Sequence, residues 1–412
     1  MKWVIQHIKQ LVNTRTNSIV VRGAELSQLP IIDNAFIVVD NGIIQAYGSM
    51  HNLNAEHLHG AELIDAVGSS VLPCWCDSHT HLVYAASREE EFVHKINGLT
   101  YAEIAAKGGG ILNSARKIAQ ATEAELYLQA MTRLQELMKL GTGAIEIKSG
   151  YGLNTENELK MLRVIKRIKA SAPIPVKASF LGAHTYPLEF KENHNGYIDQ
   201  IIHEMLPVIA KEQLADYIDV FCEEGFFSVA ETQRICEAGK SYGLKAKIHA
   251  NQLHASGGVE LGVKLGAVSV DHLETMNDTA IQALGASNTI GTMLPTAAFF
   301  LRMPYQPART LINANAALAL ASDYNPGSSP SGNMNFVVAL SCIQMKMQPE
   351  EAINAATING AFAMELQDEV GSITVGKRAN LIFTQPIPSL AYLPYSFGSN
   401  LIEKVMINGR FI

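Results

Sequence analysis

The sequence has few cysteines and no paired cysteine motif. Its 412 residues contain five cysteines, an odd number, and no two of them form a C-x-x-C pair. This usage argues against a disulfide framework and favours free thiols in a reducing compartment. We therefore expect a cytoplasmic protein.

The sequence also lacks long apolar segments and clusters of positive charge. No segment is long enough to cross a bilayer, and polar residues interrupt the amino-terminal run MKWVIQHIKQLV, unlike the apolar core of a signal peptide. The formal net charge is −7, without a run of Lys or Arg, so we expect no binding to nucleic acid or membrane. A small molecule is the expected partner, and a homodimer is compatible with the sequence.

The two ends of the chain carry the same hairpin signal. Asn41-Gly42 and Asn408-Gly409 each lie between short β-rich runs, and this dipeptide supplies the positive φ angles of a tight turn. Each end is too short to form a stable sheet alone. We therefore predict one small β-sandwich domain formed by residues 1–68 and 369–412 together.

Residues 69–368 alternate between β-rich runs and helical patterns. No Gly-x-Gly-x-x-Gly follows any run, so a dinucleotide fold lacks its phosphate loop. Apolar strands followed by helices predict an α/β fold with a (β/α)8 barrel of the TIM type. Between the second and third runs, Thr155 and Glu158 predict a capping box at the start of an amphipathic helix. The eight runs are residues 71–82, 143–150, 176–184, 218–225, 245–252, 267–274, 289–296 and 317–326.

The interval between the first two runs is longer than one crossover helix needs. It includes the Gly-rich segment AAKGGGILNSARK, whose composition suits a mobile loop. A lid over a site and a plain surface insertion both fit this pattern.

Polar residues recur at the carboxyl ends of the predicted strands, where barrel enzymes carry their chemistry. Five histidines at such ends are hard to explain by packing, so we predict one shared site. Imidazole and carboxylate together suit a divalent zinc or iron ion. Cys74 and Cys76 lie on the opposite face of their strand, so thiolate ligands are not expected. The residues at the strand ends are His79, His81, His184, His249, His272 and Asp323.

Several ordered motifs carry a resemblance to a known superfamily. DSHTHL after the first strand, single histidines after the fifth and sixth, and SDYNPGSSP after the eighth resemble the amidohydrolase superfamily of metal-dependent hydrolases. Within it, ASREEEF, GGGI, EIKSGYGL, LGAHTYP, DHLE and ASDYNPGSSP are similar to the imidazolonepropionase family. The likeness runs from about residue 65 to 380.

The resemblance implies a site and a reaction. In the family, four residues hold one zinc or iron ion, and they correspond to His79, His81, His249 and Asp323. Such an ion activates a water, which hydrolyses the cyclic amide of 4-imidazolone-5-propanoate to N-formimidoyl-L-glutamate in histidine degradation. Catalytic roles then fall to Asp323 as proton carrier and to His272 or His184 as partner of the oxyanion.

The resemblance also implies substrate contacts. Arg88 would bind the carboxylate tail of the substrate, because a guanidinium can donate two hydrogen bonds to it. The turn NPGSSP independently suits an anion, because such a turn can present backbone N–H groups. The remaining substrate-binding residues carried over from the family are Tyr151, His184, Gln252, Asn325, Gly327 and Ser328.

One departure and three alternatives accompany this interpretation. Some family members carry a Glu where this chain has Gln252, which cannot act as a base, so that role shifts to Asp323 or His272. A carbamylated Lys148 bridging two metals is not needed, because the one-metal set is complete. A deaminase of the same superfamily is the nearest alternative function, and a noncatalytic scaffold barrel is a more distant one.

Overall fold

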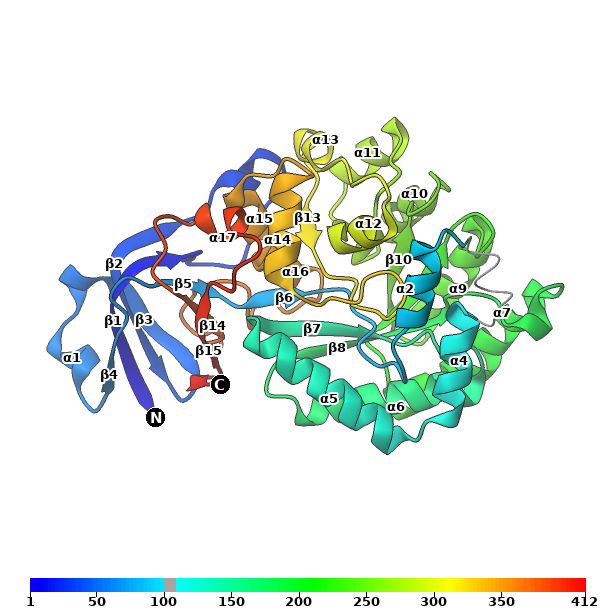
Figure 1. Ribbon diagram of the computed structural model, residues 1–412, viewed down its shortest axis with the longest axis horizontal. Coiled ribbons are helices and arrows are strands. Elements are labelled where there is room, and N and C mark those ends of the chain that lie inside the picture. The colour runs from blue at the N-terminus through cyan, green and yellow to red at the C-terminus, as the bar shows by residue number, and fades with distance from the viewer. Residues whose placement is uncertain (100–108) are drawn as a thin grey trace.

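The computed structural model describes residues 1–99 and 109–412 and contains two large sheets (Figure 1). One sheet is an eight-stranded parallel barrel with the order β13-β12-β11-β10-β9-β8-β7-β6. This arrangement confirms the predicted α/β barrel. Its strands are β6 (Trp75–Asp77), β7 (Thr142–Lys148), β8 (Val176–Ala183), β9 (Tyr217–Cys222), β10 (Lys245–Ala250), β11 (Ser269–His272), β12 (Ile290–Met293) and β13 (Leu318–Leu320).

The first and last barrel strands meet just beyond their carboxyl ends. Thr80 forms a parallel bridge with Tyr324, and the His81 amide donates to the Tyr324 carbonyl at 2.8 Å. The segment after β6 therefore lies beside the segment after β13. This contact brings the first and eighth strand ends of the predicted site together.

Helices surround the barrel, as Figure 1 shows for α5, α6, α9 and α10. Strands β7, β9, β11, β12 and β13 are buried along their whole length, as expected for a sheet covered on both faces. The helices between the barrel strands are α2 (Glu89–Ile96), α4 (Ile111–Gln120), α5 (Glu123–Lys139), α6 (Thr155–Ser171), α7 (His194–Gln200), α8 (Leu206–Glu212), α9 (Val229–Ser241), α10 (Gly258–Leu265), α11 (Asp278–Gly285), α12 (Pro295–Leu301) and α13 (Ala308–Asn313).

The predicted capping box at Thr155 is wrong by one residue. Asn154 is the N-cap of α6, and its side chain accepts from the Asn157 amide at 2.9 Å. Glu158 instead accepts hydrogen bonds from three backbone amides of the preceding turn, those of Gly150, Gly152 and Leu153. The buried Glu158 carboxylate therefore fixes the loop after β7, where Tyr151 lies.

The second sheet combines strands from both ends of the chain, which Figure 1 places on the same side of the barrel. Its order is β16-β15-β14-β5-β1-β2-β3, with β4 paired to β1. The predicted turns at Asn41-Gly42 and Asn408-Gly409 join β2 to β3 and β15 to β16, all with positive φ. The strands are β1 (Lys2–Val12), β2 (Ile31–Asp40), β3 (Ile43–Ser49), β4 (Glu62–Asp65), β5 (Ser70–Pro73), β14 (Leu381–Thr384), β15 (Ile402–Ile407) and β16 (Arg410–Phe411).

The run predicted as one strand over 71–82 divides between the two sheets. Strand β5 pairs with β1 and β14, whereas β6 pairs with β7 of the barrel. Cys74 lies between them, and its amide donates to the Asn380 carbonyl at 2.9 Å. The remaining helices are α1 (Ala55–Leu58), α14 (Met334–Ile343), α15 (Pro349–Ala356), α16 (Ile358–Phe362) and α17 (Tyr392–Tyr395).

The long interval after β6 contains α2, α4 and α5. Residues 100–108, which include the start of the Gly-rich segment proposed as a lid, lie outside the described residues.

The five cysteines are unpaired, and four of them are buried, as expected for small apolar side chains. Over residues 1–99 and 109–412, no helix combines the length and apolar character needed to cross a membrane.

Candidate metal and active site

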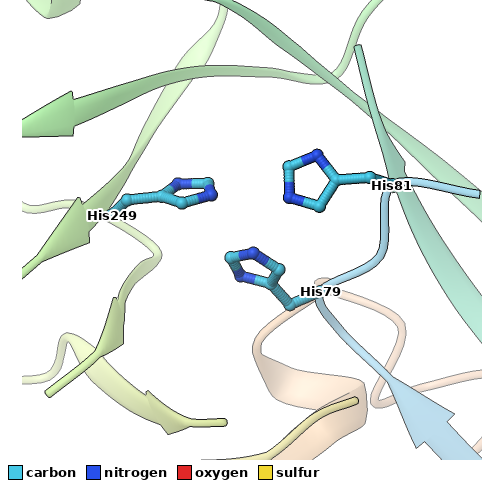
Figure 2. A group of neighbouring side chains, drawn as sticks. All are labelled: His79, His81 and His249. Atoms are coloured by element: carbon cyan, nitrogen blue, oxygen red, sulfur yellow. The ribbon is translucent and has the colours of Figure 1, made fainter. Parts of the chain in front are cut away.

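Three histidines converge at the carboxyl end of the barrel (Figure 2). His79 and His81 follow β6, and His249 lies near the end of β10. One ring nitrogen from each lies within 4.8 Å of the others, and all three residues are buried. The two first-strand histidines and the fifth-strand histidine, far apart in sequence, therefore form one cluster.

Left-handed backbone occurs at two of the strand ends that form the site. His272 and Leu273 have φ angles of 90° and 70°, and Asp323 has a φ of 51°. Such angles are unfavourable for residues with a Cβ atom, and they persist only where surrounding packing fixes them. The barrel therefore enforces a costly backbone where His272 and Asp323 face the cluster.

Buried carboxylates form hydrogen bonds with the Nδ1 atoms of two of the three imidazoles. His79 Nδ1 lies 2.7 Å from Asp271 Oδ2, and His249 Nδ1 lies 3.0 Å from Asp219 Oδ1. Because an ionised carboxylate only accepts, each Nδ1 carries the proton and each Nε2 presents a lone pair. Both Nε2 atoms are buried without a hydrogen-bond partner. This orphaned pair is the arrangement expected of metal ligands.

The lowered pKa values of the three histidines also favour metal binding. Burial lowers the pKa of His79 and His81 well below the ordinary value, and neighbouring cationic groups add to the effect. Burial also lowers the pKa of His249, although Asp219 opposes the shift. Neutral imidazoles are the form that binds a metal.

Asp323 lies beside the histidine cluster. Its Oδ1 lies 3.5 Å from Nε2 of both His79 and His81, and Ser328 Oγ lies 3.3 Å from its Oδ2. Burial raises the pKa of Asp323 to about 7, against the opposing effects of His272 and Asn325. A divalent cation beside it would lower that pKa again. Three imidazoles and one carboxylate fit a single zinc or iron ion.

A buried ion network underlies the cluster. Lys148 Nζ lies 2.6 Å from Glu146 Oε1, 2.7 Å from Asp219 Oδ2 and 3.6 Å from Asp271 Oδ2. Lys247 pairs with the other oxygen of Glu146. Burial alone would lower the pKa of Lys148, but the three carboxylates together raise it. Lys148 therefore joins, through its ammonium group, the carboxylates that contact His79 and His249.

The sequence analysis missed Asp219 and Asp271, although a signal was present. Each is an acidic residue inside a short strand that is buried along its whole length, and both are fully buried. A carboxylate in such a position needs a partner, because burying an unpaired charge costs several kcal/mol. Alternation along β9 places Asp219 on the same face as Phe221, and the register with β10 sets these two residues opposite Lys247 and His249.

His184, His272 and Tyr151 surround the cluster. His184 stacks on His81 with ring centroids 5.3 Å apart, and Tyr151 lies 5.6 Å from the same ring. His272 lies 5.3 Å from the His249 ring, and its Nδ1 is 3.5 Å from Glu274 Oε1.

The protonation of these two histidines differs. Burial lowers the pKa of His184 to about 3, and its Nδ1 lies 3.1 Å from the Gly150 carbonyl. Burial also lowers the pKa of His272, but Glu274, Asp323 and Asp271 outweigh it and raise the pKa. His184 is therefore the neutral ring and His272 the more readily protonated one.

A cavity of about 440 Å³ opens over the cluster. The predicted residues that line it are His81, Arg88, Tyr151, His184, His249, Gln252, His272, Asp323, Asn325, Gly327 and Ser328. Arg88 Nη2 donates to Glu91 Oε2 at 2.5 Å, whereas its Nε is buried without a partner. Lys95 lines the same cavity and was not predicted.

One expectation for the turn after β13 fails. The amides of Gly327 and Ser328 both donate to Asn325 Oδ1 at 2.8 Å. They are thus satisfied within the turn and do not present free N–H groups to an anion. The cause is the Asn325 side chain. It forms an Asx turn and accepts the hydrogen bonds of the two amides that we expected to face an anion.

The chain is similar to known proteins along its whole length. Residues 70–412 match the model of the Amidohydrolase family. The chain is 58% identical to a protein of Flavobacterium johnsoniae named imidazolonepropionase, covering 99% of each sequence. It is 53% identical to the imidazolonepropionase of Christiangramia forsetii, with both sequences covered completely.

Solved structures resemble the chain in fold. A triazine hydrolase variant matches with a TM-score of 0.75 at 15% identity, covering all of this chain and 94% of that one. Guanine deaminase of E. coli matches with a TM-score of 0.73 at 12% identity, over 100% and 99% of the two chains. Atrazine chlorohydrolase of Arthrobacter aurescens, in a complex with zinc and atraton, matches with a TM-score of 0.73 at 14% identity, over 99% and 94%.

Proposed function

The chain belongs to the amidohydrolase family and, within it, to the imidazolonepropionases, and we propose that its barrel cavity opens the ring of 4-imidazolone-5-propanoate to give N-formimidoyl-L-glutamate. The observation that carries the proposal is one cavity lined both by His81 and His249 of the histidine cluster and by Arg88. The cluster suits hydrolysis of an amide, and the guanidinium suits the propanoate tail.

His79, His81, His249 and Asp323 would hold one divalent ion, either zinc or iron. Support comes from the orphaned Nε2 atoms of His79 and His249 and from the nearby Asp323 oxygen. When bound, such an ion lowers the pKa of a water and polarises a carbonyl group.

Asp323 would accept the proton of the attacking water and pass it to the departing ring nitrogen. Its carboxylate lies at the cluster, and Ser328 orients its second oxygen. Gln252 lies in the same cavity, but an amide cannot take up this proton. Transfer through one positioned carboxylate then serves both bond formation and bond cleavage.

His272 is the better partner for the oxyanion. The His184 Nδ1 faces the Gly150 carbonyl, which only accepts, so in the neutral ring the proton lies on Nδ1 and Nε2 can only accept. His184 would therefore receive a hydrogen bond from a ring N–H of the substrate. His272, held beside Glu274, can donate to the developing negative charge.

Arg88 would bind the propanoate carboxylate, with its unpartnered Nε as one donor. Tyr151, Gln252, Asn325, Gly327 and Ser328 would shape the cavity around the ring and the product. Because the turn amides of residues 327 and 328 are already bonded to Asn325, the charged side chains carry the anion recognition.

The experiment is product analysis after incubation with 4-imidazolone-5-propanoate. We expect a product that has gained one water and retains both nitrogens. A deaminase, the alternative within the same superfamily, would instead release ammonia from an amine-bearing ring. Ammonia release, or an unchanged substrate in metal-loaded protein, would refute the proposed function.

A further inference from the structure

Lys95 lies on the cavity wall beside Arg88 and has no role in the function proposed above. Arg88, Glu91 and Lys95 are spaced three and four residues apart at the start of and along α2, so they share one face of the helix. That face borders the cavity, since Arg88 and Lys95 both line it. The Phe92 ring stacks on Phe300 at 5.5 Å, which holds α2 in place.

Both cations lie against the same turn. Lys95 Nζ is 3.4 Å from the Gly327 carbonyl oxygen. Arg88 Nη1 lies so close to Gly327 that a Cβ atom there would be 2.3 Å from it. The guanidinium and the ammonium therefore approach the same edge of the cavity.

The charge of Arg88 is already balanced. Glu91 is buried, pairs with Arg88 at 2.5 Å and also accepts from the Gly110 amide at 2.9 Å. This second bond fixes the carboxylate as a lasting partner of the guanidinium. Arg88 can offer donors and shape to an incoming anion, but the pair Arg88–Glu91 contributes no net charge.

Lys95, in contrast, has no carboxylate in direct contact within the described part of the chain. Over residues 1–99 and 109–412, it forms no ion pair within 4.0 Å with a carboxylate. Its Nζ donates a long hydrogen bond to the Gly327 carbonyl and lies 5.8 Å from the centroid of the Phe300 ring. Burial lowers the pKa of Lys95 and the charge of Arg88 adds to the shift, although Glu91 opposes it.

We propose that Lys95 is a specificity-determining residue whose ammonium supplies the net positive charge that selects substrates with a carboxylate tail. The inference rests on the proposed function for the identity of that tail. Arg88 then sets the orientation of the carboxylate, and Lys95 sets the preference for an anion over a neutral group of the same shape. A carboxylate entering between them would restore electrical balance at this edge.

The test measures binding by metal-loaded protein of two matched probes, 3-(imidazol-4-yl)propanoate and its neutral propanamide. The wild type should bind the propanoate more tightly. In Lys95→Met, that preference should fall by about tenfold, the effect of one lost charge interaction in a partly buried site. Lys95→Arg should retain most of the preference, because it keeps the charge.

Lys404→Met is the matched control. Lys404 is exposed on β15 in the other sheet, so the variant makes the same change of net charge without touching the cavity. Its preference should equal that of the wild type. With the natural substrate, Lys95→Met should raise KM by about tenfold and change kcat by less than about threefold.

Two results would overturn the inference. One is an unchanged preference for the propanoate in Lys95→Met. The other is an equal loss of affinity for both probes, which would assign Lys95 a purely structural contact with the Gly327 turn. Because the binding test needs no turnover, failure of the wild type to hydrolyse the imidazolone would refute the proposed function alone.

Discussion

At the scale of single residues, the two roles proposed for Asp323 place opposite demands on its carboxyl group. As a metal ligand it would have to be ionised, and as a proton carrier it would have to take up a proton during the reaction. Burial raises its pKa to about 7, whereas a nearby dication would favour the charged form. A carboxylate balanced between these effects can do both within one turnover.

Replacement of Asp323 by Asn tests this balance. The amide keeps the size and one oxygen donor, but it cannot accept a proton at neutral pH. We expect kcat of metal-loaded Asp323→Asn to fall by about 10²- to 10⁴-fold, the usual contribution of general base catalysis. The acidic limb of the pH profile should change as well. A near wild-type kcat with an unchanged acidic limb would mean that His272, and not Asp323, carries the proton.

At the scale of elements, asparagine side chains form hydrogen bonds to backbone groups of segments that are distant in sequence. Asn359 in α16 is the clearest case, since it is fully buried. Its Nδ2 donates to the carbonyls of Val21 and Leu318 at 2.7 and 2.8 Å, and its Oδ1 accepts from the Val21 amide at 3.0 Å. One side chain thus joins the amino-terminal segment to barrel strand β13.

Asn359→Ala should lower the free energy of unfolding by about 2 to 4 kcal/mol, because each buried polar group left unsatisfied costs about 1 to 3 kcal/mol. Urea unfolding measures the change. Asn52→Ala, at an exposed position, serves as the control and should be close to neutral. A loss below about 0.5 kcal/mol for Asn359→Ala would mean that the segment finds other partners.

At the scale of the whole molecule, the proposed ion would couple the barrel strands that supply its ligands. His79, His81 and His249 come from two non-adjacent strands, β6 and β10. Without an ion, their free nitrogens remain buried and unpaired, which costs stability. Binding to the folded state alone therefore stabilises the fold.

Removal of the ion by a chelator should lower Tm, and added zinc should restore it. At free zinc a hundredfold above Kd, the stabilisation is about 2.7 kcal/mol. His79→Ala and His249→Ala should lose the ion in metal analysis, and their Tm should no longer respond to the chelator. His203→Ala, at an exposed position, should behave as wild type. Full metal retention in both cluster variants would refute the ligand assignment.

A buried lysine at the junction between the two sheets, Lys377, should make the stability of the fold depend on pH. Lys377 is buried, and its Nζ donates to Ser372 Oγ at 2.7 Å and to the Val370 carbonyl at 3.1 Å. Burial lowers its pKa to about 8, although Cys76 opposes the shift. In the unfolded chain a lysine pKa is about 10.4.

Between these two pKa values the unfolded state binds more protons than the folded state, so the contribution of Lys377 to stability rises with pH. The wild type should therefore gain stability relative to Lys377→Met from pH 7 to pH 9.5. Urea unfolding of both proteins at the two pH values measures this. A constant difference would show that Lys377 titrates normally in the folded protein.

The sequence by itself determined the barrel, the paired ends of the chain and the positions of the strand-end histidines. β-rich apolar runs indicate strands directly, and Asn-Gly indicates a tight turn because few residues tolerate its φ angles. These are local properties. They required no knowledge of which residues meet in space, and the barrel and both Asn-Gly turns are confirmed.

Only the tertiary structure decided which groups pair. The carboxylates behind His79 and His249, the balance of Arg88 by Glu91 and the engaged amides of the Asn325 turn all depend on contacts. The division of residues 71–82 between two sheets depends on them as well. Ion pairs and hydrogen bonds form only between groups that lie a few ångströms apart. For segments that are far apart in sequence, that proximity arises only after the strands have assembled.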